Sequence, residues 1–178
     1  MPAPVRSLSP GAVPTGPGFD VVLLLHVVAA IVALGSVVAS GVQSTRLLAA
    51  GDGEVPSGVT VYFAPGVNWV GRTLHAVPLL GLALVGLSHG AYGFEDGWIE
   101  WGIGLWVAAA VGAEAVLWPA ERRVQAGLAA SGDGHDLGQV HAAGVRSETA
   151  RSARTTAVAA GALTAVLVAA VVVMVAQP

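Results

Sequence analysis

Asn68, Arg72 and His75 are the residues of this chain whose types and spacing point most directly to chemistry. Separations of four and three residues place them on one face of a helix. Their segment is apolar, and a charged group at helix depth in a bilayer costs at least about 2.5 kcal/mol on insertion scales. Glu114 lies at a similar expected depth on the next apolar segment. The pattern predicts a direct or water-bridged Arg72–Glu114 pair, with separate extension of both side chains to the interface as the alternative.

On each of the two segments, further residues share a helical face with these polar side chains. The Arg72 face continues through Leu82 and Gly86 to His89, and the other segment presents Glu100, Gly104, Val107, Val111 and Glu114. We expect both stripes to point inward, towards protein or water. A proton path or a small transporter that uses Arg72, His75 and Glu114 is one function that such stripes would serve.

His26, His75 and His89 are the candidate cofactor ligands. His75 and His89 are fourteen residues apart on one segment, a spacing that resembles the ligand pairs of cytochrome b. With His26 on another helix, at most one bis-histidine haem b is possible. The simpler interpretation makes His26 a neutral ring that donates one hydrogen bond to a neighbouring helix, and His89 an interfacial residue.

Other site chemistry finds little support. Asp133, His135, Asp136 and His141 lie in and after a glycine-flanked loop, but no zinc-ligand spacing is present, so we predict a solvated loop and no metal site. Cysteine is absent, which removes thiolate ligands and cysteine nucleophiles. There is no phosphate-binding loop or HExxH motif. No basic run suggests nucleic-acid binding. The sequence therefore favours a non-enzymatic role.

Four apolar segments must position these side chains. Hydrophobic residues make up 54% of the 178 residues and charged residues only 11%, whereas soluble domains have about 25% charged residues. Each segment approaches the roughly 20 residues that a helix needs to cross a bilayer, and lipid requires every backbone polar group to be paired within the helix. The prediction is an all-α integral membrane four-helix bundle in one domain, with helices at about 19–40, 67–88, 98–118 and 155–176.

The remaining segments suggest loops and an orientation. Residues 1–18 form a proline-rich tail, and 121–154 is predicted to be a helical hairpin outside the bilayer. The tail is long and has only Arg6, so we interpret the first segment as a span rather than a cleaved signal peptide. Arginines concentrate in the loops after the first and third helices, which predicts that these loops are cytoplasmic and both termini lie outside. The lysine-free, Ala-, Val- and Gly-rich composition is typical of a high-GC bacterial genome, so we expect the inner (plasma) membrane.

Small residues should bring the helices together, because lipid is as apolar as leucine and close packing drives their association. The last helix has Ala157, Gly161, Ala165 and Ala169 at four-residue spacing, and the first has Ala29, Ala33, Ser36 and Ser40. We expect these stripes to pack within the chain or, alternatively, in a homo-oligomer or against another membrane subunit. Tryptophans at both ends of the third helix (Trp98, Trp101 and Trp118) fit interfacial belts.

Both ends of the apolar region carry a family resemblance. The first helix contains Leu25-His26-Val27-Val28-Ala29-Ala30 followed by Gly35, and the chain ends Met174-Val175-Ala176-Gln177-Pro178. From about Phe19 to Pro178 the chain resembles the bacterial predicted integral membrane proteins called domain of unknown function twenty-two sixty-nine. Gln177 departs from the lysine usual there. The resemblance implies a four-helix membrane fold with His26 as the first-helix histidine, and it implies no activity.

The leading functional hypothesis is a small accessory or scaffold protein of the membrane. A second hypothesis is a haem-b or copper-binding redox protein that uses His26 with His75 or His89, and copper-resistance-D-like membrane proteins resemble the chain more weakly through their LH pairs. The third is the small transporter or proton path.

Overall fold

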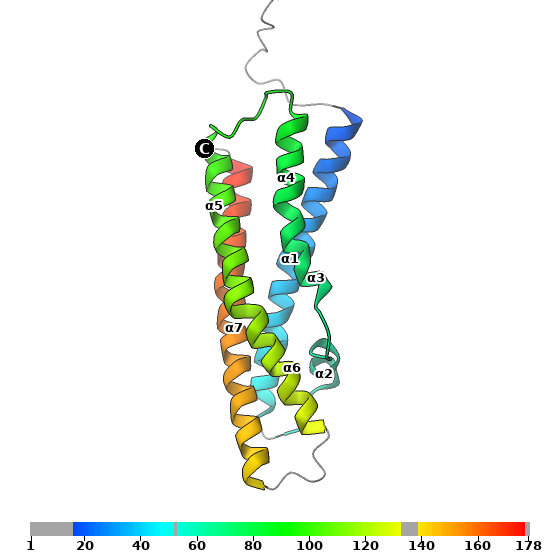
Figure 1. The fold of residues 1–178 in the computed structure, drawn as a ribbon, viewed down its shortest axis with the longest axis vertical. Helices are drawn as coiled ribbons and strands as arrows, with labels where there is room; N and C mark the ends of the chain where they lie inside the picture. Colours follow the sequence, from blue (N-terminus) through cyan, green and yellow to red (C-terminus); the bar gives the residue numbers. More distant parts are fainter. Residues whose placement is uncertain (1–15, 52, 133–138, 177–178) are drawn as a thin grey trace, which may run out of the picture.

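A computed structural model describes residues 16–51, 53–132 and 139–176 (Figure 1). In these ranges the chain is helical and has no strand, which confirms the all-α prediction. The helical elements, in chain order, are α1 (Pro17–Ala50), α2 (Ser57–Tyr62), α3 (Trp69–Arg72), the 3-10 turn η1 (Thr73–His75), α4 (Ala76–Leu87), α5 (Gly97–Gly112), the π turn η2 (Ala113–Leu117), α6 (Trp118–Gly132) and α7 (Gln139–Ala176).

Four helical stretches within the described residues are long and apolar enough to cross a membrane: Pro17–Ala50, Trp69–Leu87, Gly97–Ser131 and Ala143–Ala176. The chain is therefore a multi-pass membrane protein. The described parts of the segment 121–154 are helical, and both are continuous with apolar helices. α6 continues from α5 through η2, and α7 runs without a break from Gln139 to Ala176. Apolar residues of the second core cluster, which include Val124 and Ala153, prolong the packed interior along these extensions.

The spanning helices are arranged as a row rather than a closed ring. α7 packs along α1, α5 and α6, and α4 packs on α1, while α4 and α5 make few backbone contacts with each other. In Figure 1, α4 lies beside α1 in the upper half and α6 diverges from α7 in the lower half. One core cluster fills the centre with residues of α1, η1, α5, η2, α6 and α7, and the other gathers residues of α1, α2, α6 and α7 around Phe63.

Of the two small-residue stripes expected to pack, the one on α1 is buried, and most of the one on α7 is exposed. Ala33, Ser36 and Ser40 of α1 are buried, as expected. From Thr156 onward the buried residues of α7 are Thr156, Ala160, Leu163 and Ala170, whereas Gly161, Ala165 and Ala169 are exposed. The α7 surface that meets α1 includes Ala160, whose Cβ lies 3.1 Å from the position that a Cβ on Gly41 would take. Small residues recur on two sides of α7, and only the side that contains Ala160 packs against α1.

Pro78 explains the irregular start of the second span. A proline in a helix has no N–H for the carbonyl four residues before it, and its ring crowds that carbonyl. Here the affected carbonyl belongs to Leu74, and the backbone tightens into the 3-10 turn η1 at this level. The indole N–H of Trp106 donates to the Leu74 oxygen over 2.9 Å. Trp106 thus satisfies the freed carbonyl and ties α5 to the base of α4.

Pro119 similarly accounts for the π turn η2. Because Pro119 has no N–H, it cannot bond to the carbonyl of Ala115, and the helix widens just before it. Within η2 the N–H of Trp118 donates to Ala113, five residues earlier. Residues seven apart share a face of a regular α-helix, but a π turn contains an extra residue and rotates the face that follows. Glu114 consequently points outward and Glu121 inward, although both belong to one continuous helical stretch.

Candidate functional site

The most deeply buried ionisable side chain of the described residues is that of Glu121, which is 4% exposed. It lies in the first turn of α6 and accepts a hydrogen bond from the hydroxyl of Ser40 on α1. No ion-pair partner contacts it within the described part of the chain. Glu121 begins the segment 121–154 that the sequence predicts to be a helical hairpin outside the bilayer, and that prediction did not include burial of its side chain between α6 and α1.

A chain of hydrogen bonds connects Glu121 to the α2–α3 connection. The hydroxyl of Tyr62, at the end of α2, lies 2.6 Å from the Ser40 hydroxyl, and the amide nitrogen of Asn68 lies 3.4 Å from the Tyr62 oxygen. Asn68 is the N-cap of α3, where its side-chain oxygen accepts the N–H of Gly71 over 3.0 Å. This cap fixes the orientation of the amide, so that its nitrogen donates towards Tyr62.

The distances allow two arrangements of the hydroxyl hydrogens. With Glu121 as a carboxylate, Ser40 donates to Glu121 and Tyr62 donates to Ser40. With Glu121 protonated, its O–H donates to Ser40, and Ser40 turns to the Ser36 carbonyl oxygen, 3.1 Å away. Tyr62 can turn to the same carbonyl at 3.4 Å. The network therefore offers hydrogen-bond partners to both protonation states of Glu121.

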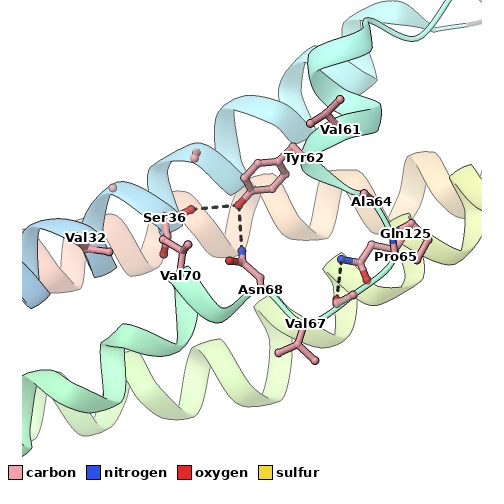
Figure 2. Close-up of a pocket in the computed structure, with 13 residues that line it drawn as sticks. Val32, Ser36, Val61, Tyr62, Ala64, Pro65, Val67, Asn68, Val70 and Gln125 are labelled. Atoms are coloured by element: carbon pink, nitrogen blue, oxygen red, sulfur yellow. Dashed lines mark hydrogen bonds between the residues drawn. The ribbon is translucent and has the colours of Figure 1, made fainter.

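Tyr62 and Asn68 form the wall between this network and an open groove of about 620 Å³ (Figure 2). Figure 2 shows the Tyr62 hydroxyl between Ser36 and Asn68, and the Gln125 amide donating to the Gly66 carbonyl at the other end. Burial raises the pKa of the Tyr62 phenol above its ordinary value, and the charge of Glu121 acts in the same direction. The apolar part of the lining comes from α1 and the α2–α3 connection, with Val32, Ala39, Val61, Ala64, Pro65, Val67 and Val70.

A second polar cluster forms around Glu114, and it contains the ion pair expected from the sequence. A guanidinium nitrogen of Arg72 lies 2.8 Å from Glu114 Oε1, and Nε2 of His75 lies 3.2 Å from the same oxygen. The guanidinium also stacks on the Trp118 ring, 3.9 Å from its centroid. Trp118 is buried and so does not belong to an interfacial belt. All three charged or titratable side chains remain partly exposed, Glu114 at 50%.

The two inward stripes expected from the sequence are not buried within one chain. On α4, Leu82 and Gly86 are exposed, and on α5 and η2 so are Glu100, Gly104, Val107, Val111 and Glu114. The side of α5 that packs inward instead carries Ile99, Gly102, Ala109 and Ala110. Asn68 also leaves the expected face, because it caps α3 and joins the Glu121 network while Arg72 and His75 join Glu114.

The three histidines each have a different environment. His26 Nδ1 lies 2.9 Å from the Val77 carbonyl, to which it must donate, as the simpler interpretation expected. His75 contacts Glu114 and lies edge-on to Trp106 and Trp118. His89 is exposed after the end of α4 and has a positive φ of 51°. These are protein partners for His26 and His75, and the haem hypothesis stays a prediction without support from these contacts.

No group of three or more histidine, aspartate or glutamate side chains in the described ranges is placed to hold a metal ion. Asp133, His135 and Asp136 lie outside the described residues, as does the side chain of His141.

Glu121, Ser40 and Tyr62 are the site residues that sequence reasoning missed. Ser40 had been interpreted only as a small packing residue. A signal for Glu121 was present, because Ala113, Leu117, Ala120, Val124 and Leu128 continue an apolar helical stripe past Trp118. Such a stripe predicts that the helix remains packed beyond the expected span, with Glu121 at its buried edge.

Comparison of the chain with protein-family models, with curated proteins and with solved structures finds no match. The resemblance drawn from the LH motif and the chain end therefore stays a prediction, and the functional argument rests on the geometry of this chain.

Proposed function

We propose that this protein is a non-enzymatic membrane protein that takes up and passes on a proton at Glu121. The observation that carries the proposal is the Glu121 carboxyl group, 4% exposed, which bonds to the Ser40 hydroxyl and contacts no cation within the described residues. Glu121 lies about 36 Å along the helix from Gly97, near the edge of a hydrocarbon core that is roughly 30 Å thick. Buried ionisable groups that bond to polar neighbours in membrane-spanning helices are typical of proton relays. This function develops the proton-path hypothesis, with Glu121 in place of His75 as its central residue.

The residues have distinct roles in this proposal. Glu121 holds the proton, while Ser40 and Tyr62 change donor direction as the proton enters or leaves. Asn68 positions the Tyr62 hydroxyl at the groove, from which water supplies the proton.

We place the groove on the cytoplasmic side of a bacterial inner membrane, with both termini outside. The support is the distribution of arginine: Arg46, Arg122, Arg123, Arg146, Arg151 and Arg154 are exposed on the parts of α1, α6 and α7 that make the lower half of Figure 1. The α4–α5 connection at the upper end contains Glu95 and Asp96 and no arginine. Positively charged loops are retained in the cytoplasm.

Proton flux in liposomes tests the proposal. Purified protein is reconstituted with a pH-sensitive dye inside the vesicles, and a potassium diffusion potential drives proton movement. We expect wild-type flux above that of protein-free vesicles and loss of this excess in Glu121→Gln. Glu100→Gln makes the same chemical change at an exposed carboxyl of α5 and is expected to retain the flux.

Infrared difference spectroscopy separates proton uptake from proton conduction. A pH step should change the carbonyl stretch of a protonated carboxyl, and Glu121→Gln should remove that signal. Uptake without flux would reduce the function to proton-linked switching. Absence of both signals in folded wild-type protein would overturn the proposal and leave the accessory or scaffold role.

A further inference from the structure

Helix α4 is unusual because none of its residues is buried, although it belongs to a membrane span. It packs on α1, with His26 over Gly81, and leaves its other side uncovered. Leu79 and Leu82 are the large side chains of that uncovered side, 66% and 48% exposed. In Figure 1, α4 lies in front of α1 and α5 lies in front of α7, so both face the near side of the molecule.

Charged groups lie at the base of this uncovered region. The side chains of Arg72, His75 and Glu114 are 32%, 41% and 50% exposed. Arg72 is about 22 Å along the helix from Leu87, and Glu114 about 25 Å from Gly97, both less than the roughly 30 Å thickness of the hydrocarbon core. Half-exposed charges at such depth are unfavourable against lipid and call for cover by protein or water.

The exposed side of α5 that leads to Glu114 permits close packing of another helix. Gly86 on α4 and Gly104 on α5 have no atoms within 4 Å of the position where a Cβ would stand. Val107 and Val111 lie between Gly104 and Glu114 and are exposed. Small residues on a membrane helix permit a neighbouring backbone to pack closely. The α4–α5 face is defined here as Leu82 and Gly86 of α4, Gly104, Val107 and Val111 of α5, and the charged or titratable residues at their base, Arg72 of α3, His75 of η1 and Glu114 of η2.

We propose that the α4–α5 face is the docking surface for a second copy of this chain. The face carries a cation, Arg72, and an anion, Glu114, at matching depth. In a two-fold dimer whose axis is normal to the membrane, residues keep their depth, so Arg72 of each copy meets Glu114 of the other. The face is thus complementary to its own image, and dimerisation would cover the two stripes that the sequence marks as inward.

The exposed small-residue stripe of α7 is the competing surface. Its exposed residues are Gly161, Ala165 and Ala169, which are uncharged and can contact lipid chains without cost. The α4–α5 face differs because its charged groups remain partly uncovered in one chain. This difference assigns the dimer contact to α4 and α5.

Cysteine cross-linking in native membranes tests the assignment, and the chain contains no cysteine that would interfere. Single cysteines replace Leu82 or Val107 on the proposed face, and Ala165 on α7 as the matched control. Mild oxidation should produce a disulfide-linked dimer from Leu82→Cys or Val107→Cys and leave Ala165→Cys monomeric. A dimer only from Ala165→Cys, or a link only to a different protein, would overturn the proposal.

The charged pair gives an independent measurement in lipid nanodiscs by native mass spectrometry. Wild type should be a dimer, Glu114→Arg and Arg72→Glu should each reduce the dimer fraction, and the double reversal should restore it. Near-ultraviolet circular dichroism verifies that each variant is folded. A monomeric wild type, or single variants that stay dimeric while folded, would refute the role of this face.

Discussion

At the residue scale, the chemistry of this protein depends on which ionisable group the fold buries. Arg72 and Glu114 pair as their types predict, yet both stay partly exposed. Glu121 is buried among hydroxyl groups. Charge pairing can be expected from residue types at similar depth, whereas burial depends on the neighbouring helices.

Tyr62 provides a pH prediction at this scale. Its raised pKa means that the folded state favours the neutral phenol, so this stabilisation is complete below the unfolded value of about 10 and is lost as the pH rises through the folded pKa. We expect tyrosinate absorbance to show one group, absent in Tyr62→Phe, that titrates above 10. Glu121→Gln should lower its midpoint, because the Glu121 charge disfavours tyrosinate.

Tyr62→Phe should also reduce the loss of stability at alkaline pH, as measured by unfolding in detergent. The chain has only one other tyrosine, Tyr92, so the difference between the two titrations isolates Tyr62. A folded wild type in which Tyr62 titrates at or below 10 would contradict the burial of its hydroxyl.

At the element scale, two prolines shape the helices that carry both polar clusters. Pro78 leaves the Leu74 carbonyl to Trp106, and Pro119 follows the π turn that directs Glu114 and Glu121 to different sides. Local chemistry thus creates the irregular turns, and each turn determines which neighbour a side chain reaches.

A double-mutant cycle tests the link between Pro78 and Trp106. Trp106→Phe removes the donor to Leu74 and should lower the free energy of unfolding by about 1 kcal/mol, the usual net value of a hydrogen bond. In a Pro78→Ala background the new N–H supplies Leu74 from within the helix, so the same change should cost less. Chemical unfolding in mixed micelles measures the loss of unfolding free energy from Trp106→Phe in each background. Equal losses would exclude the idea that the Trp106 N–H replaces the missing N–H of Pro78 as donor to Leu74.

At the scale of the whole molecule, the arrangement of the helices in a row determines which polar cluster is covered by other helices. α7 contacts α1, α5 and α6, while α4 is held chiefly by α1. The Glu121 network therefore lies in a well-packed region, and the Arg72–Glu114 pair lies at the edge of one chain. The two proposals accordingly concern different regions and can fail separately.

Orientation is tested with the same cysteine-free background. Ala91 in the α4–α5 connection and Ser147 in the first half of α7 are exposed, so each can carry a single cysteine. The two segments lie at opposite ends of the molecule (Figure 1). A membrane-impermeant maleimide should label Ala91→Cys in intact cells, and Ser147→Cys only after permeabilisation, because arginine-rich segments stay inside. The reverse labelling would invert the proposed topology and place the groove outside.

The sequence by itself determined the class of the fold and one contact of the polar clusters. Apolar length and the need to pair backbone groups in lipid are properties of each segment, so four candidate spans and an all-α fold follow without tertiary information. The Arg72–Glu114 pair follows as well, because its depth can be counted along two helices. The sequence also predicted that His26 bonds to a neighbouring helix, and its ring bonds to Val77 of α4.

Only the tertiary structure decided which side of each helix is buried. In a membrane segment nearly every face is apolar, so hydrophobic periodicity does not distinguish the packed side of α7 from its exposed small-residue stripe. The π turn before Pro119 rotated the helix between Glu114 and Glu121, which no regular period reproduces. The burial of Glu121 with Ser40 and Tyr62 depends on three segments far apart in the sequence, and their packing alone brings these side chains together.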